Sequence, residues 1–429
     1  MTSIVFHLGD RKTGSKSIQI TLASGAWTCD SVRLLFPQPG KVNHIPLSRS
    51  LTDKAVYSQR EPRFRAMASE IEAKAPDVAI ISAEDFESAD PLMLREAVRN
   101  YMPGFTETAR YIAYVRPHAD RLVSEFAEQV KQGSQTKNLE DFHHRILKRG
   151  RFQFINRFRK WREAFGEQFE LRPMIRDRLF QQDVVADLLQ FTLNGAPFKI
   201  LETPRSNESL MLEDLSVLQE LQRQIGAGKG KPSELMSSTG WMMARRMNAN
   251  PRANSTKLRL HRSLAEAVVL AYREDAAALD AEFFAGTPMS DALASAPDKS
   301  VDVAQSIAVE DVYSGDDLRM IRLWTGQVAE MLLATPEVWP KLFRSTHRMN
   351  VIKQTATEPV AVGIGRGKGR GKGKGMQRGA SGPAGARLQG TSGLMQNAGG
   401  GKPGARRKGQ QGGGKQQRPN AGKAATESE

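Results

Sequence analysis

The sequence holds very little cysteine, because Cys29 is the only one among 429 residues. A single thiol excludes an internal disulfide framework and suits a reducing compartment. No apolar run approaches about 18 residues, the length that a membrane-spanning helix needs, so we expect no membrane span. A strand-like apolar run begins at Ile4 and leaves no room for a signal peptide. These absences together predict a cytoplasmic protein.

Residues 361–429 contain no aromatic side chain and only two carboxylates, against 14 Lys and Arg, so they carry about +12 of the net charge of +15. A segment so poor in apolar groups cannot offset its conformational entropy by burial. We therefore predict a disordered basic, glycine-rich tail over residues 356–429. Its charge favours attachment to a polyanion such as RNA, DNA or an acidic polysaccharide. A merely solubilising extension is the alternative.

The rest of the chain alternates strand-like and helical patterns. Apolar runs recur near Ile4, Val78, Tyr111 and Phe169. This alternation predicts an α/β fold with a parallel β-sheet flanked by helices, over residues 1–290. Residues 291–355 are expected to form a helical extension. The expected helices cover residues 64–74, 91–101, 119–132, 154–165, 183–191, 210–225 and 264–284.

The helix expected over residues 264–284 has a marked apolar pattern, which predicts that one side of it is buried. The side chains assigned to that side are Leu264, Val268, Leu270, Tyr272, Ala276 and Leu279.

Residues 7–17 read His-Leu-Gly-Asp-Arg-Lys-Thr-Gly-Ser-Lys-Ser and connect the first apolar run to a segment that can continue as a helix. A strand, a glycine-bearing turn and a helix aim several backbone N–H groups and the positive helix end at one point. Lys12 adds a mobile cation, and Ser15 and Ser17 can donate hydroxyl hydrogen bonds. The stretch predicts a site for a phosphate-like dianion, although many turns of this composition bind nothing.

The nucleotide-binding Walker A pattern, G-x-x-x-x-G-K-[ST], fits this stretch poorly. Gly9 and Gly14 have the required separation, but Ser15 intrudes before Lys16. One extra residue rotates the lysine by about 100° at the start of a helix. A kinase that binds ATP with magnesium is therefore the weakest of the functional interpretations.

The same stretch resembles the 5′-phosphosulfate loop of bacterial sulfotransferases, roughly H-[IL]-G-x-x-K-T-G-[ST]-[ST]-[ST]-[IL]-Q. It departs at Arg11, where proline is usual, and at Lys16, where a small hydroxyl residue is usual. Further segments are similar to later elements of that family in the same order, so the resemblance covers residues 4–285. These segments are residues 78–86, with Ile-Ser-Ala-Glu-Asp-Phe, residues 109–117, which end in Arg-Pro, residues 169–173 and residues 183–189.

The resemblance implies a P-loop sulfotransferase fold and the donor 3′-phosphoadenosine-5′-phosphosulfate. It assigns charge compensation at the reacting group to Lys12, and binding of the donor's 3′-phosphate to Arg116 and Ser124. Donor binding is implied for Arg11, Thr13, Gly14, Ser15, Lys16, Ser17, Arg116, Ser124 and Lys257. No metal is expected, since none of the seven histidines shows a ligand spacing with a carboxylate partner.

The acceptor hydroxyl needs a base, for which Glu84 is the first candidate because it follows the carboxyl end of a strand. Asp85 and His118 are the alternatives. The leading hypothesis is transfer of a sulfuryl group to a hydroxyl of a carbohydrate or small-molecule acceptor. The competing hypothesis, favoured by Arg11 and Lys16, is a catalytically inactive sulfotransferase-like protein that binds nucleic acid or another polyanion through its tail.

Overall fold

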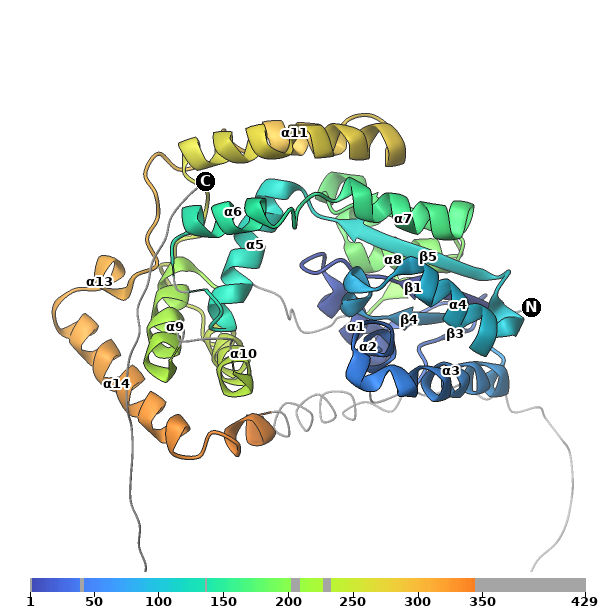
Figure 1. Cartoon of the computed structure of the whole chain (residues 1–429), viewed down its shortest axis with the longest axis horizontal. Coiled ribbons are helices and arrows are strands. Elements are labelled where there is room, and N and C mark those ends of the chain that lie inside the picture. The colour runs from blue at the N-terminus through green and yellow to red at the C-terminus, as the bar shows by residue number, and fades with distance from the viewer. Residues whose placement is uncertain (1, 39–41, 136, 202–208, 227–232, 344–429) are drawn as a thin grey trace, which may run out of the picture. The chain divides into compact units, whose positions relative to one another are not determined.

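The computed structural model describes residues 2–38, 42–135, 137–201, 209–226 and 233–343 (Figure 1). The chain divides into two units, Met1–Val360 and Ala361–Glu429. The predicted disordered tail and the last part of the predicted helical extension, residues 344–355, lie outside the described residues. Within the described ranges, no helix is both long enough and apolar enough to cross a bilayer.

A five-stranded sheet, whose strands all run parallel, forms the centre of the first unit. All four predicted strand regions belong to it, which confirms the predicted α/β class with a parallel sheet flanked by helices. A fifth strand of two residues lies at one edge. In spatial order the strands are β3 (Leu34–Leu35), β4 (Val78–Ser82), β1 (Ser3–His7), β5 (Ala109–Val115) and β6 (Phe169–Pro173).

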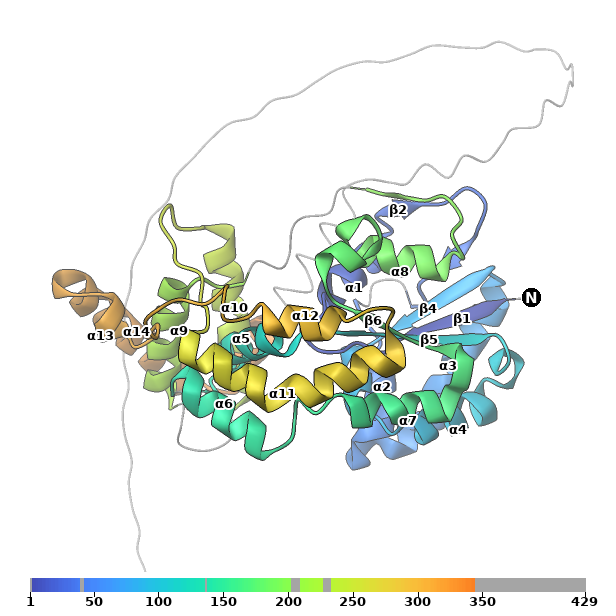
Figure 2. The same ribbon diagram turned by 90° about the horizontal axis from the view of Figure 1, so that it is seen from above.

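Successive residues of β1 point to opposite faces of the sheet, as the strand period of two requires. Ile4 and Phe6 belong to the larger core, and Val5 belongs to the smaller one. The larger core includes residues of α3 (Arg60–Lys74), α4 (Pro91–Tyr101) and α7 (Ile155–Phe165). The smaller core includes residues of α1 (Ser15–Ser24) and α8 (Val184–Thr192). Figure 2 shows these two groups of helices on the two sides of the sheet.

A second helical group surrounds α5 (His118–Lys131), which follows β5 directly. Both α9 (Leu212–Ile225) and α10 (Glu234–Ala249) pack against α5, and α14 (Gly315–Ala334) packs against α9. The remaining α-helices and strands are α2 (Ile45–Thr52), α6 (Leu139–Lys148), α11 (Arg262–Phe283), α12 (Pro288–Ala294), α13 (Val309–Val312) and an antiparallel pair, β2 (Trp27–Thr28) with β7 (Lys199–Ile200).

The seven predicted helices are present, with ends that shift by up to four residues. One assignment on α11 is wrong, because Leu270 is 66% exposed while Leu279 is fully buried. The buried positions of α11 repeat at intervals of three and four residues from Leu264 to Leu279. Leu270 follows the buried Val268 by two residues, about 200° around the helix, and therefore points to the opposite side.

Candidate functional site

Three segments that are distant in the sequence meet at the carboxyl ends of β4, β1 and β5. These strands are neighbours in the sheet, and they lead into Glu84, the β1–α1 loop (residues 8–14) and Arg116. The Nη1 of Arg116 donates a hydrogen bond to the carbonyl oxygen of Lys12 over 3.2 Å. Gly9 packs so closely on the next segment that an added Cβ would lie 3.0 Å from the Cα of Glu84. The structure thus brings Lys12, Glu84 and Arg116 to one place.

The β1–α1 loop folds around the carbonyl oxygen of Asp10. The hydroxyls of Thr13 and Ser15 donate to that oxygen over 2.6 and 3.2 Å. Lys12 and Gly14 have positive φ angles of 66° and 81°, which turn the backbone at two points. Two of the hydroxyls that the resemblance assigns to the donor, those of Thr13 and Ser15, therefore brace the loop in this structure.

The same fold leaves a run of backbone donors unused. The amide N–H groups of residues 12–16 make no hydrogen bond to any other described residue. The next amide, that of Ser17, donates to the carbonyl oxygen of Gly14 over 2.9 Å and begins the helical pattern. Successive unpaired amides at the N-terminus of a helix form a concave site for an anion. Backbone donors without a described partner thus lie where the sequence predicts an anion site, which stays a prediction.

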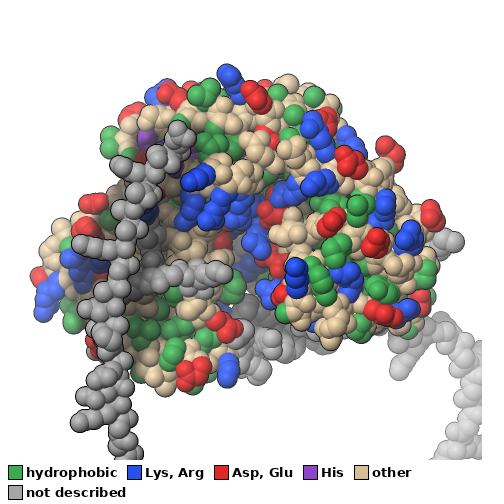
Figure 3. Space-filling model, in the orientation of Figure 1, with side chains coloured by type: hydrophobic (Ala, Val, Ile, Leu, Met, Phe, Trp, Pro, Cys, Tyr) green, Lys and Arg blue, Asp and Glu red, His purple; other side chains and the backbone are tan. Residues whose placement is uncertain are grey.

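Several positive side chains lie near Lys16, at the start of α1. The Nζ of Lys12 lies 3.1 Å from Oε2 of Glu128, which also accepts from Lys131 over 2.7 Å. Lys16 is exposed on the first turn of α1, where partial desolvation, followed by the ammonium of Lys131, lowers its pKa. The ammonium of Lys131 repels that of Lys16, and an anion bound near Lys16 would relieve this repulsion. Figure 3 shows that Lys and Arg side chains gather near the middle of the face that it draws.

Glu84 is the base candidate whose carboxylate stays available. It is half-buried and makes no ion pair within the described chain, and burial raises its pKa above the ordinary value. Asp85 pairs with Arg11 and Arg49 over 3.1 and 3.2 Å. His118 lies in the core, with its Nε2 2.9 Å from Asp275, so the structure does not place it at the loop.

Arg11 does not extend toward the unpaired amides. Its guanidinium pairs with Asp85 and, over 3.8 Å, with Glu87. Arg11 therefore takes part in an acidic and basic network under the loop, and the predicted role in donor binding is not supported by its contacts.

The sequence analysis did not predict the central ion pairs of that network. Asp10 accepts from Arg157 over 2.8 Å, and Arg121 lies 3.5 Å from the same carboxylate. Burial raises the pKa of Asp10 to about 6, with Arg157 opposing it. Burial alone would raise the pKa of Glu87 too, but Arg121 and Arg157 hold it below its usual range. Both arginines lie more than 100 residues from Asp10, so no local motif signals the contact.

Two predicted donor-binding residues remain apart from these contacts. Ser124 lies on α5, half-buried and without a hydrogen bond to any described residue, two turns after Arg116. Lys257 is exposed, and its carbonyl oxygen accepts from Gln305 over 3.2 Å. No hydrogen bond or ion pair links Lys257 with the β1–α1 loop among the residues the structure describes, so the structure does not bring Lys257 to the site.

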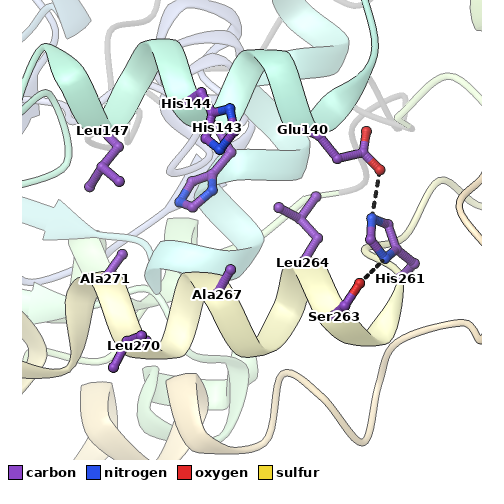
Figure 4. Close-up of a pocket in the computed structure, with 10 residues that line it drawn as sticks. All are labelled: Glu140, His143, His144, Leu147, His261, Ser263, Leu264, Ala267, Leu270 and Ala271. Carbon is purple, nitrogen blue, oxygen red and sulfur yellow. Dashed lines mark hydrogen bonds and ion pairs between the residues drawn. The ribbon is translucent and has the colours of Figure 1, made fainter.

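A separate groove of about 460 Å³ lies between α6 and α11 (Figure 4). His261 bonds to Glu140 over 2.5 Å and to Ser263 over 2.9 Å on its wall. None of the residues predicted for donor binding or catalysis lines this groove. In the described ranges, no three His, Cys, Asp or Glu side chains are grouped so that they could hold a metal ion.

In comparisons with known proteins, no family model matches the chain and no curated protein matches it. Any assignment of function therefore depends on the motifs and on the geometry described above.

A substitution at Gly14 tests how closely the β1–α1 loop packs on α8. Its φ of 81° disfavours a side chain, and an added Cβ would lie 2.7 Å from Cγ1 of Val184. Gly25 has a similar φ of 63° but open space around it. We expect Gly25→Ala to lower the free energy of unfolding by about 1–2 kcal/mol. Gly14→Ala should cost clearly more in the same denaturant titration, and equal losses would contradict the close packing of the loop on α8.

Proposed function

We propose that this protein is a sulfotransferase that moves a sulfuryl group from 3′-phosphoadenosine-5′-phosphosulfate to a hydroxyl of a carbohydrate or small-molecule acceptor. The observation that carries the proposal is the run of amides at residues 12–16 that make no hydrogen bond to a described residue, with the Arg116 guanidinium against the backbone of Lys12. A nucleotide with phosphates at both ends needs two anion sites next to each other. The contact between Arg116 and the Lys12 carbonyl supports this arrangement, because it holds a guanidinium next to the loop.

The donor's two ends meet different parts of the chain in this proposal. The 5′-phosphosulfate accepts from the amides of residues 12–16 and faces the ammoniums of Lys12 and Lys16, at the positive end of α1. The 3′-phosphate lies against the guanidinium of Arg116, a residue type that binds phosphate with two parallel hydrogen bonds. Ser124 can face the same phosphate from α5.

The reaction needs positioning and charge compensation more than covalent chemistry from the protein. The acceptor oxygen forms a bond to sulfur while the bond from sulfur to the bridging oxygen of the 5′-phosphate breaks. Lys12 stabilises the negative charge that develops on that bridging oxygen. Glu84 takes the proton of the acceptor hydroxyl, so the products are a sulfate ester, adenosine 3′,5′-bisphosphate and a protonated Glu84.

The contacts of Arg11 weaken the competing hypothesis of an inactive protein. Arg11 is one of the two departures from the sulfotransferase loop pattern, but its side chain pairs with Asp85 and Glu87 instead of occupying the anion site. The other departure, Lys16, adds a positive charge where the donor is anionic. Neither residue obstructs the unpaired amides.

Replacing Lys12 tests the proposal at its reacting centre. We expect Lys12→Ala to lower sulfuryl transfer from labelled donor to a glycan panel by about 100- to 1000-fold, because one aimed positive charge at the leaving oxygen is lost. The exposed Lys54 is the matched control, and Lys54→Ala should leave the rate unchanged. Failure of the wild-type chain to bind adenosine 3′,5′-bisphosphate at millimolar concentration, or preferential binding of magnesium ATP, would reject the proposal.

The pH dependence tests the role of Glu84. Because only the carboxylate accepts a proton, the rate should rise with pH through the pKa of Glu84, which burial raises above the ordinary value. Glu84→Gln should lower kcat sharply and abolish that rising limb, while nucleotide affinity changes little. The exposed Glu96 supplies the control, Glu96→Gln. A rising limb that persists unchanged in Glu84→Gln would assign the base to another group.

A further inference from the structure

Glu128 places a negative charge next to the ammonium groups of Lys12 and Lys131. Its Oε2 accepts from Lys12 and from Lys131, and its Oε1 accepts from Gln132 and Trp241 over 3.0 and 3.2 Å. Burial alone would raise the pKa of Glu128, but the ammoniums of Lys12 and Lys131 outweigh it and hold the pKa well below its usual range. Glu128 is therefore ionised at any pH near neutrality.

Helix α10 also holds this carboxylate, through the indole of Trp241. An added Cβ on Gly240 would lie 1.7 Å from the carbonyl oxygen of Lys131, so α10 approaches α5 as closely as only glycine permits. Gln222 ties the helices together by donating to the carbonyl oxygens of Lys131 and Met236 over 2.7 and 2.9 Å. This packing sets Trp241, the residue after Gly240, against Glu128.

The carboxylate of Glu128 has more partners than the ammonium of Lys12. Without Lys12, the carboxylate of Glu128 keeps hydrogen bonds from Lys131, Gln132 and Trp241. Lys12 has Glu128 as its one ion-pair partner among the described residues, and its side chain is 28% exposed. Arg116 meanwhile holds the carbonyl oxygen of Lys12. The ammonium can therefore turn away while its own backbone and the carboxylate stay in place.

We propose that Glu128 is a positioning residue that holds the Lys12 ammonium before the donor binds and releases it to the phosphosulfate. This inference rests on the proposed function. The donor offers Lys12 a larger negative charge than a carboxylate that is already shared with Lys131. Glu128 thus competes with the donor for Lys12, and donor binding exchanges one charge partner for another.

The substitution Glu128→Gln separates these roles, because it removes the competing charge and keeps the size of the side chain. We expect calorimetric titration with adenosine 3′,5′-bisphosphate to show about tenfold tighter binding than in the wild-type protein, since an opposite charge at this distance typically shifts a proton equilibrium by that factor or more. Glu96→Gln removes the same charge from an exposed position on α4 and should leave the affinity unchanged. In a Lys12→Ala background, Glu128→Gln should give almost no gain, because the effect acts through Lys12.

The indole N–H resonance of Trp241, assigned by its loss in Trp241→Phe, gives a second readout. It should move in the wild-type protein when the nucleotide is added, because Glu128 changes its partners. Wild-type binding without a gain in Glu128→Gln, or a gain that persists in the Lys12→Ala background, would overturn the inference and leave the proposed function standing. If the wild-type protein binds no nucleotide, both the inference and the proposed function are rejected. If Glu128→Gln does not fold, Glu128→Asp takes its place in the test. This variant keeps the charge but shortens its reach to Lys12, so it should bind the nucleotide more tightly than the wild type.

Discussion

The site depends on one residue of the β1–α1 loop, the buried Asp10. Its carbonyl oxygen accepts the hydroxyls of Thr13 and Ser15, while its carboxylate accepts from Arg157. The first contacts bend the loop, and the last ties it to α7, which carries Arg157. The loop's own hydroxyls satisfy that carbonyl, and the amides of residues 12–16 make no hydrogen bond within the described part of the chain. A buried carboxylate with arginine partners is costly to disturb, so the loop keeps its shape.

The parallel sheet gives the loop its neighbours. The carboxyl ends of parallel strands lie at one edge of the sheet. Because β4, β1 and β5 are neighbours, the residues that follow them, Glu84, Lys12 and Arg116, lie together. Helix α5 then continues from β5 and presents Glu128 to the same site from its last turns. The chemistry proposed for the chain therefore follows from the order of three adjacent strands and from the helix that leaves the third.

Patterns that involve neighbouring residues could be predicted from the sequence, and contacts across long separations could not. The apolar run of β4 and the proline that starts α4 predict those elements directly, and the glycine spacing predicts the turn between β1 and α1. Strand β3 has two residues and no pattern to detect. The pairing of Asp10 with Arg157 depends on how α7 packs. The orientation of the Arg11 side chain depends on its pairing with carboxylates more than 70 residues away.

The central claim is that one nucleotide spans both anion sites, and the most direct measurement is a crystal structure of the protein with adenosine 3′,5′-bisphosphate. The account predicts the 5′-phosphate on the amides of residues 12–16 and the 3′-phosphate within hydrogen-bond distance of the Arg116 guanidinium. A nucleotide bound elsewhere, or bound at the loop with its 3′-phosphate turned away from Arg116, would contradict it.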